Sequence, residues 1–464
     1  MTGLVHPGAR LVDAATGAVV AGADLSDRVD AAAEAYGRLP AGAAFALMPT
    51  ETPAVLRLLG ALAGGRPVAP LDPTLPDATL RAMVARFRPA IVTGVSGRDD
   101  PPDGYRAEQP ARLGAAWLRQ DPPEWIPHRD LALLLTTSGS TGNPKLVRLS
   151  RTAVVANADS IATALGVEGD EVAPTTLPLF YTYGLSVLTS HLRRGATVVL
   201  ERSGLTSREF WRAVDEHGAT SMAAVPYQYE ILHRLRLDPG RYPRLRTLTQ
   251  AGGRLRPELI ADFHARMAAV GGRMFVMYGQ TEATARMTVL PPDCLPARLG
   301  SVGLPVPGGT VAVDPETDEV VYRGPNVMMG YAETAADLAR GDDLGGVLAT
   351  GDRGRLDEDG FLFITGRLKR MAKVFGVRVD LDDIERMVAH HGPVAAVAGD
   401  DRLLVYVESN DAEAAAKLRA ELAAGIGTHS SGVDVQPVAA LPLTPAGKID
   451  YRTLEGASWP GPSR

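Results

Sequence analysis

The sequence predicts an α/β protein with a large N-terminal body of layered strands and helices, followed by a small α+β domain. Three observations predict this class. From about residue 45, short apolar runs alternate with amphipathic stretches, which is the pattern of a layered sheet covered by helices. After about Pro291 the runs become short and alternating, separated by turn sequences, which indicates a β-rich, barrel-like part. Beyond Gly366 strands and helices alternate again.

In the first part we expect helices at Pro53–Ala63 and Ala78–Phe87. Ser150 has the side chain of a helix N-cap, and the helix that it begins should run to about Leu165. Strands are expected at Leu131–Leu135, Ala196–Leu200, Ser221–Val225, Leu245–Thr249 and Met274–Met277.

The β-rich part should span about residues 300–366, with strands at Thr310–Val313, Glu319–Tyr322, Gly354–Leu356 and Phe361–Thr365. The C-terminal part should contain helices Leu381–His390 and Ala412–Ala424 and strands Val394–Ala398 and Leu403–Glu408. We place a domain boundary near Arg367–Arg370. The predicted domains are therefore 1–366 and 367–464.

Composition narrows the function. Apolar residues make up 45% of the 464, enough for a sizeable core. The 48 basic and 54 acidic residues nearly balance, which argues against bulk binding of nucleic acid or an anionic membrane. Cys294 is the only cysteine, so no intramolecular disulfide or cysteine zinc site can form. Met1–Arg10 lacks the pattern of a signal peptide and no apolar run could span a bilayer, so we expect a cytoplasmic protein.

The strongest motif is a Ser/Thr/Gly-rich run that follows an apolar strand and ends in a lysine, Thr136–Lys145. Such a loop can present backbone N–H groups and hydroxyls to phosphate oxygens, and its glycines allow close approach. Lys145 adds a point charge. The run is no Walker P-loop, because Gly139 and Gly142 are only three positions apart. A flexible surface loop is the plain alternative, and phosphate binding is favoured.

This run resembles the signature loop of the AMP-forming acyl-adenylate superfamily, which contains acyl- and aryl-CoA synthetases, nonribosomal peptide adenylation domains and luciferases. The resemblance extends over roughly residues 45–454 and implies an ATP-binding, AMP-forming ligase with Mg²⁺. The implied nucleotide-binding residues of the loop are Thr137, Ser138, Gly139, Ser140, Thr141, Gly142 and Lys145, with Thr141 also a magnesium ligand and catalytic.

Met277–Glu282 is the second matching motif. A carboxylate near a phosphate loop is a natural Mg²⁺ ligand, and a tyrosine face can stack on a purine. Taken alone, the segment could be an ordinary turn. The resemblance implies that Tyr278 covers adenine and that Glu282 is a catalytic magnesium ligand. The remaining nucleotide contacts implied here are Gly279, Gln280 and Thr281, together with Ala251, Gly252 and Gly253.

Two motifs near the predicted boundary complete the match. By resemblance, Asp352 and Arg367 bind the ribose and phosphate, and Lys369 is the hinge about which the C-terminal domain moves. Lys448 follows Pro445 and Gly447 near the C-terminus. It corresponds to the catalytic lysine of the family, whose role is to stabilise charge on the phosphorus during adenylation.

The resemblance also implies an acyl pocket lined by Tyr181, Tyr183, Tyr227 and Gly303. For Tyr183 and Tyr227, plain core packing is the alternative. Many relatives place a histidine where Tyr181 stands, and a neutral tyrosine supplies no cation to a carboxylate. Near Lys373–Arg378 the chain departs from CoA-forming relatives, with Phe375 and Val377 around the glycine, which leaves the acceptor the weakest part of the interpretation.

The sequence therefore predicts a ligase that joins a small carboxylic acid to AMP, releases pyrophosphate and passes the acyl group to a thiol, with CoA the first choice. A carrier-protein phosphopantetheine or an amine is the alternative acceptor. A non-catalytic adenylate-binding relative is the alternative from another class, and a luciferase-like oxygenase is a third. The acid, and the choice between monomer and homodimer, stay open. No nucleic acid partner and no membrane insertion are expected.

Overall fold

The structure is a computed structural model that describes residues 3–98, 100–136, 145–368, 370–374, 377–399, 402–409, 411–426, 429–445 and 447–456. The chain forms two compact units. The first comprises Met1–Val311 and Tyr322–Leu348, and the second comprises Ala312–Val321 and Ala349–Arg464. The predicted division at 366/367 differs from this one, because residues 349–366 belong to the second unit. The domain motion expected about residue 369 stays a prediction.

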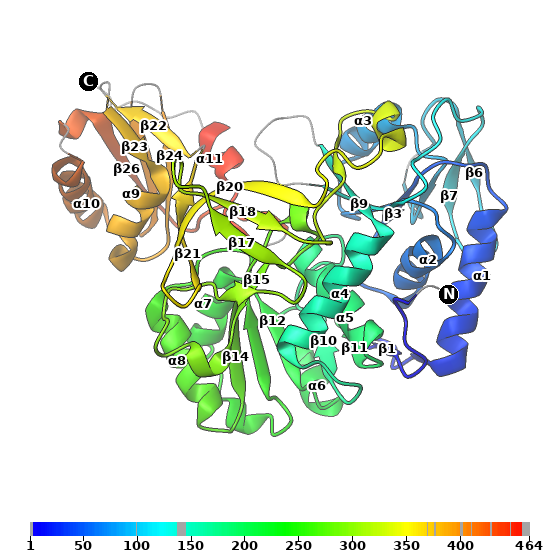
Figure 1. Ribbon diagram of the computed structural model, residues 1–464, viewed down its shortest axis with the longest axis horizontal. Helices are drawn as coiled ribbons and strands as arrows, with labels where there is room; N and C mark the ends of the chain where they lie inside the picture. Colours follow the sequence, from blue (N-terminus) through cyan, green and yellow to red (C-terminus); the bar gives the residue numbers. More distant parts are fainter. Residues whose placement is uncertain are drawn as a thin grey trace. The chain divides into compact units, whose positions relative to one another are not determined.

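An eight-stranded sheet with the order β19-β9-β8-β4-β3-β5-β7-β6 organises the N-terminal part of the first unit (Figure 1). Strands β3, β4 and β5 are parallel, and all their residues are buried, as is typical of strands covered on both faces. The strands are β3 (Ala44–Leu47), β4 (Val68–Leu71), β5 (Ile91–Thr93), β6 (Tyr105–Glu108), β7 (Ala116–Arg119), β8 (Leu131–Thr136), β9 (Leu146–Ser150) and β19 (Gly330–Ala332).

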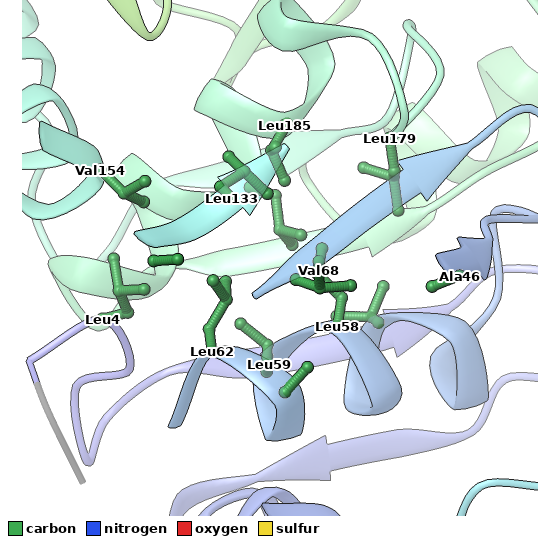
Figure 2. Packing of buried hydrophobic residues seen from close by; sticks show 14 of the residues in the cluster. Leu4, Ala46, Leu58, Leu59, Leu62, Val68, Leu133, Val154, Leu179 and Leu185 are labelled. Atoms are coloured by element: carbon green, nitrogen blue, oxygen red, sulfur yellow. The ribbon is translucent and has the colours of Figure 1, made fainter. Parts of the chain in front are cut away.

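Helices α1 (Gly22–Gly37), α2 (Thr52–Ala63) and α3 (Asp77–Phe87) flank this sheet. Figure 2 shows the leucines of α2, including Leu58 and Leu62, pointing toward Val68 and Leu133 of the strands. Gly60 lets α1 and α2 pack closely, because a Cβ there would lie 2.5 Å from the Cβ of Ala32. The packed core thus holds the carboxyl end of β8 in place, and this is where the predicted phosphate loop begins.

The rest of the first unit contains two further sheets. One has the order β10-β11-β1-β2, and the other has the order β12-β13-β14-β15-β16. Their strands are β1 (Arg10–Asp13), β2 (Val19–Ala21), β10 (Val172–Pro174), β11 (Thr197–Leu200), β12 (Ser221–Ala224), β13 (Thr247–Gln250), β14 (Arg273–Tyr278), β15 (Thr288–Leu290) and β16 (Leu304–Pro305). The helices are α4 (Arg151–Leu165), α5 (Thr182–Arg193), α6 (Arg208–Glu216), α7 (Pro226–Arg234) and α8 (Pro257–Ala268).

Strands β12, β13 and β14 are parallel, and their carboxyl ends meet at one edge of the sheet. Ala224, Gln250 and Tyr278 end these strands. The loops that follow begin at the same edge, which is where ligands bind in open α/β sheets. The predicted Ala251–Gly253 and Tyr278–Glu282 segments both start here.

Two sheets and a hairpin contribute to the rest of the chain. The first sheet has the order β17-β18-β20-β21, and the division between the units falls within β17, β18 and β20. A three-stranded sheet has the order β24-β25-β26, and β22 pairs with β23. The strands are β17 (Thr310–Val313), β18 (Glu319–Arg323), β20 (Val347–Leu356), β21 (Leu362–Arg367), β22 (Met371–Val374), β23 (Val377–Asp380), β24 (Val394–Ala398), β25 (Leu403–Glu408) and β26 (Val433–Val438), with helices α9 (Leu381–Met387), α10 (Ala412–Gly425) and α11 (Tyr451–Gly456).

The predicted α/β class is confirmed. Ser150 caps α4, since its side chain accepts a hydrogen bond from the Ala153 N–H. Several predicted boundaries are wrong: the strand predicted at Leu245–Thr249 is Thr247–Gln250, and the strand predicted at Gly354–Leu356 begins at Val347. Val225 does not extend β12 but is the N-cap of α7, because Pro226 at the next position has the fixed φ of a first helical turn. The helix predicted to reach His390 ends at Met387 and is followed by a separate 3₁₀ turn. Among the described helices, each is too short or too polar to cross a membrane.

Candidate active site

The predicted phosphate loop connects two neighbouring strands. Thr136 ends β8, Leu146 begins β9, and the two residues are paired in the antiparallel ladder. The loop is therefore held at both ends by a buried sheet. Residues 137–144 lie outside the described residues, and with them the predicted ligands Thr137, Ser138, Gly139, Ser140, Thr141 and Gly142.

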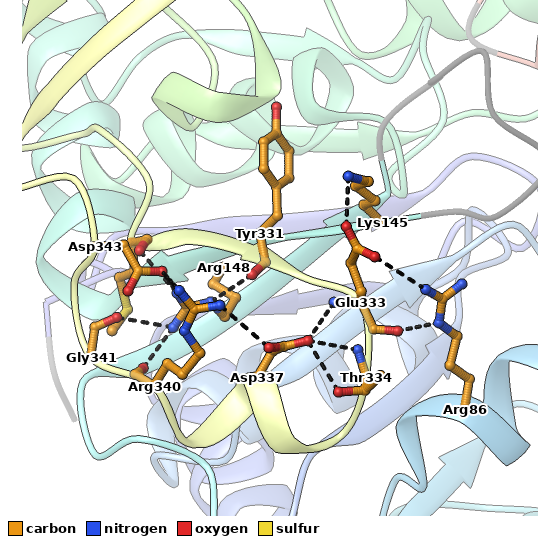
Figure 3. A network of polar contacts seen from close by, with 11 residues as sticks. Arg86, Lys145, Arg148, Tyr331, Glu333, Thr334, Asp337, Arg340, Gly341 and Asp343 are labelled. Atoms are coloured by element: carbon orange, nitrogen blue, oxygen red, sulfur yellow. Dashed lines mark hydrogen bonds and ion pairs between the residues drawn. The ribbon is translucent and has the colours of Figure 1, made fainter.

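Lys145, the last residue of the loop motif, forms an ion pair with Glu333. Its Nζ lies 2.6 Å from Oε1 of Glu333 and 5.8 Å from the ring centre of Tyr331. Arg86 lies on the other side of Glu333, with Nη2 3.8 Å from Oε2 (Figure 3). Glu333 thus holds two cations in place. The Lys145 side chain is half-exposed, so it remains accessible to an anionic ligand.

The segment that carries Tyr331 and Glu333 is fixed to β9 by a buried arginine. The Arg148 guanidinium, fully buried, pairs with the Asp343 carboxylate and donates to the carbonyls of Met329, Arg340 and Gly341 (Figure 3). Burial lowers the pKa of Arg148, and Asp343 opposes this. The cluster anchors β19 beside β9, so Tyr331 and Lys145 arrive on adjacent strands.

The Tyr278–Glu282 segment turns sharply at the carboxyl end of β14. A Cβ at Gly279 would lie 1.8 Å from the Ala285 carbonyl oxygen, so only glycine fits there. Thr281–Ala283 form a 3₁₀ turn, in which the Glu282 carboxylate accepts a hydrogen bond of 2.7 Å from the Tyr331 hydroxyl. Tyr331 therefore brings Glu282 and Lys145, 137 positions apart in the chain, to one place.

Glu282 has the chemistry of a magnesium ligand. One carboxylate oxygen accepts the Tyr331 hydroxyl, and the carboxylate forms no salt bridge with any described residue. The backbone beneath it is firmly held, because its carbonyl accepts from the Met328 N–H and the neighbouring Ala283 carbonyl accepts from the Asn326 side chain. A hard cation prefers such an oxygen donor. The donor set therefore fits Mg²⁺.

Ala251, Gly252 and Gly253 form a tight turn after β13. Ala251 is buried, and Gly252 has a φ of +85°, which favours glycine. The Gln250 side chain donates to the Gly253 carbonyl at 2.8 Å, closing the turn. The turn lies at the same sheet edge as Tyr278. That both bind a nucleotide stays a prediction.

The predicted acyl-pocket residues have different environments. Tyr181 is the N-cap of α5, and burial raises its pKa well above the usual value, so it stays neutral. Tyr183 is buried, with its hydroxyl 2.8 Å from Oγ1 of Thr249. Tyr227 is 38% exposed, so core packing does not describe it. Gly303 permits close backbone packing, because a Cβ there would lie 2.1 Å from Val289 backbone atoms.

The second unit carries the remaining predicted residues. Asp352 and Arg367 are opposite each other on β20 and β21, and Arg367 Nε lies 3.1 Å from Oδ1 of Asp352. Asp352 is buried, whereas the Arg367 side chain is largely exposed. Lys448 sits on a tight hairpin, in which the Thr444 N–H donates to the Lys448 carbonyl at 2.7 Å. The predicted hinge, Lys369, lies outside the described residues.

Sequence reasoning missed Tyr331, Glu333, Asn326 and Arg286. The first three support the loop residues, and their signal is absent from the sequence because they follow the motif by more than 40 positions without a pattern of their own. Arg286 follows Glu282 by four positions, yet nothing local shows whether its side chain faces solvent or the interior.

Comparisons with known proteins agree with this geometry. The AMP-binding enzyme family matches residues 9–332. A sulfoacetate–CoA ligase of Cupriavidus necator is 32% identical over 345 residues, 70% of this chain and 66% of the relative. An oxalate–CoA ligase of Arabidopsis thaliana is 31% identical over 57% of this chain and 54% of its own length. The chain thus matches less than two thirds of the length of each of these two ligases. A 4-coumarate–CoA ligase-like protein of Oryza sativa is 30% identical over 84% of this chain and 77% of its own.

Solved structures share the fold. The o-succinylbenzoate CoA synthetase of Bacillus subtilis, in complex with its acyl-adenylate intermediate, superposes with a TM-score of 0.77 at 21% identity, covering 97% of this chain and 95% of that one. The same protein with ATP and a magnesium ion has a TM-score of 0.73 at 21% identity, covering 95% and 94%. With the family match over most of the chain, these observations establish that this protein belongs to the AMP-binding enzyme family.

Proposed function

We propose that this protein is an ATP-dependent ligase that converts a carboxylic acid to its acyl-adenylate with release of pyrophosphate, and then transfers the acyl group to CoA. The observation that carries the proposal is the convergence of Lys145 and Glu282 on Tyr331, at the end of the Ser/Thr/Gly-rich loop. The relatives named as CoA ligases for sulfoacetate and oxalate, together with the 4-coumarate–CoA ligase-like relative, support the reaction class.

The acidic and basic residues of the site have different roles in the proposed reaction. Magnesium, held by Glu282 and Thr141, would neutralise phosphate charge when bound. Lys145 exchanges Glu333 for a phosphate oxygen, because a half-exposed ion pair costs little to break. The reacting carboxylate is already ionised at neutral pH and needs no base. Lys448 stabilises the charge that develops at the phosphorus, and Asp352 with Arg367 orients the ribose.

Pyrophosphate release across a panel of carboxylic acids tests the proposal, with hydroxylamine to trap the adenylate. We expect at least one acid to give ATP-dependent release, and Glu282→Gln and Lys448→Ala each to lower it by about 100-fold or more, as for removal of a preorganised charge. Lys417→Ala, an exposed lysine of α10 in the same unit as Lys448, is the matched control. Undiminished release in Lys448→Ala would remove that residue from the mechanism.

The acceptor is tested separately. Adding CoA to the active acids should yield the acyl-CoA and free AMP. If CoA is inert while a phosphopantetheinylated carrier or an amine accelerates AMP release, the acceptor is wrong and the adenylating half stands. If no acid releases pyrophosphate, the protein is a non-catalytic relative. The cytoplasmic location and the hinge at Lys369 remain predictions from the sequence.

A further inference from the structure

A small internal cavity lies between helices α4 and α5 and the parallel strands β12, β13 and β14. Its lining is mostly apolar, with Ile161, Val187 and Met222 among its walls. Arg286 also lines it and is only 3% exposed. The cavity therefore combines a buried arginine with apolar walls and with serine, threonine, histidine and glutamate side chains.

Among the described residues, the Arg286 guanidinium interacts with Met277 and with the ring and hydroxyl of Tyr183. Its Nε lies 3.4 Å from the Met277 sulfur, and its Cζ lies 3.8 Å from the centre of the Tyr183 ring. A thioether is a weak acceptor, and a ring face attracts a cation without accepting its N–H bonds in the manner of a carboxylate. No carboxylate among the described residues forms an ion pair with Arg286.

The one acidic residue that lines the cavity is already in use. Glu171 pairs with Arg246, with Oε1 3.1 Å from Nη2, and accepts a hydrogen bond from the Thr220 hydroxyl. An isolated buried cation is costly, because it loses its hydration without gaining a counter-charge. Burial accordingly lowers the pKa of Arg286, while Tyr183 and Tyr181 oppose this. An anion that entered the cavity would remove the cost.

The backbone aims Arg286 inward. Its carbonyl accepts from the side-chain amides of Asn157 and Asn326, both at 3.0 Å. Thr284, two positions earlier, has a φ of +65°, which reverses the chain between Glu282 and Arg286. Glu282 then contacts Tyr331, whereas Arg286 contacts Tyr183 and Met277 in the interior. The two charged side chains of this loop thus lie in different surroundings.

We propose that Arg286 binds a second anionic group, a carboxylate or sulfonate, at the far end of the acid substrate. The inference rests on the proposed function, which puts the reacting carboxylate beside Glu282 and the phosphate loop. The substrate class is then a dianionic acid. The Tyr183 ring lies against the guanidinium, and the Tyr183 hydroxyl also contacts Thr249. An anion would be a stronger acceptor for the Arg286 N–H groups than either Met277 or Tyr183.

Matched pairs of acids test the proposal: propionate with malonate, butyrate with succinate, and valerate with glutarate, together with 3-sulfopropionate. The measurement is kcat/KM for pyrophosphate release by the full chain. We expect the best dianion to exceed its monoanionic partner by about 100-fold, and Arg286→Met to abolish or reverse that preference, since one member of a buried charge pair is lost. Arg286→Lys should retain part of it. Arg273→Met is the control, because Arg273 also lies over a ring, that of Phe275, but is exposed.

Two results would overturn the proposal: a wild-type protein without preference for any dianion, or equal losses for both members of each pair in Arg286→Met. A thermal-shift measurement separates this from failure of the ligase reaction. If no acid releases pyrophosphate, yet succinate raises the melting temperature of the wild type more than butyrate does and this difference is lost in Arg286→Met, the anion site stands and the proposed function fails. If Arg286→Met does not fold, the wild-type preference and Arg286→Lys decide.

Discussion

Two arginines of the first unit are buried to nearly the same degree and yet have opposite surroundings. Arg148 is surrounded by acceptors: the Asp343 carboxylate and several backbone carbonyls (Figure 3). Arg286 meets a sulfur atom and an aromatic ring. Both lie near the segments that form the candidate site: Arg148 follows Lys145 on β9, and Arg286 follows Glu282 in the loop after β14.

This difference indicates that the charge of Arg148 has a structural role, whereas the charge of Arg286 is available to a ligand. The N–H groups of Arg148 donate to acceptors within residues 329–343, and these bonds fix the positions of Tyr331 and Glu333. Arg286 has no such set of oxygen acceptors, since its Nε lies beside the Met277 sulfur and its guanidinium lies over the Tyr183 ring. A buried ion pair need not stabilise a fold relative to apolar residues, but removing one partner of such a pair is strongly destabilising. The two arginines should therefore respond very differently to the same substitution.

The largest effect is expected for Arg148→Met. The variant takes a hydrogen-bond donor from the carbonyls of Arg340 and Gly341, whereas Asp343 keeps its ion pair with Arg340 and the Met329 carbonyl keeps the Asp343 N–H. Each buried acceptor left without a donor costs about 1–3 kcal/mol, so we expect a loss of about 3–5 kcal/mol in the free energy of unfolding. Urea denaturation of wild type and variant measures it. A loss below about 1 kcal/mol, similar to that of Arg340→Met at the exposed rim of the cluster, would show that Arg148 is not the clamp.

The next effect concerns Lys145, the exposed counterpart of these arginines. Lys145→Met removes a charge from the phosphate loop, and we expect KM for ATP to rise about tenfold or more, the value of a charged hydrogen bond. Its stability should change by less than about 1 kcal/mol, because the pair with Glu333 is exposed.

Glu333→Gln tests whether the ion pair with Glu333 weakens the binding of ATP by Lys145, since Glu333 competes with phosphate for Lys145. We expect KM for ATP to fall by a factor of about two to five, within the energy of an exposed pair. Steady-state pyrophosphate release at varied ATP measures both variants. A rise in KM for Glu333→Gln would mean that Glu333 positions Lys145 for catalysis and does not merely restrain it.

How much of this could be predicted from sequence depends on where the signal lies. The tight turns after β13 and β14 could be predicted, because small residues such as Gly252 and Gly279 are required by backbone geometry and leave a local pattern. The α/β layers followed from apolar runs. Tyr331 could not be predicted, because its contact with Glu282 is made by the pairing of β19 with β9.

Arg286 shows the same limit more sharply. The sequence places an arginine in a loop, where solvent exposure is the usual outcome. Its burial depends on the reversal at Thr284 and on two asparagine side chains from distant segments, Asn157 and Asn326. That no carboxylate in the described part of the chain pairs with it is a property of the packed interior. Tyr227 gives the opposite case: its helix begins at Pro226, and the side chain remains exposed, although core packing was an alternative.

A smaller effect is expected from the stability of Arg286→Met without ligand. Methionine removes the desolvation cost of the cation but also its contact with Tyr183, worth up to about 2 kcal/mol when desolvated. These terms nearly cancel, so we expect a change within about 1 kcal/mol of zero in urea denaturation, in contrast to Arg148→Met. A loss of 3 kcal/mol or more would place Arg286 with Arg148 as a structural residue.

The smallest effect tests whether the cavity as a whole excludes charge, and it concerns His191 among its lining residues. His191 is buried, with Nδ1 2.8 Å from the Val187 carbonyl oxygen and Nε2 3.3 Å from Oγ of Ser221. Nδ1 therefore donates to the carbonyl, and burial favours the neutral ring. Burial lowers the pKa of His191 below its usual 6.5, although Val187 and Glu171 oppose this. The unfolded chain takes up the proton first, so stability is present above pH 6.5 and is lost as the pH falls below it.

Compared with wild type, His191→Asn should lose less stability between pH 7.5 and pH 6.0, by a few tenths of a kcal/mol and no more than about 0.9 kcal/mol. Paired urea denaturations at the two pH values give this difference, and all other titrating groups cancel in it. His264→Asn, a partly exposed histidine of α8, is the control for loss of any imidazole. If wild type and His191→Asn have the same pH dependence, protonating the buried His191 ring costs no measurable folding stability. Arg286 would then need no anion to offset its burial, and the contrast with Arg148 would rest on geometry alone.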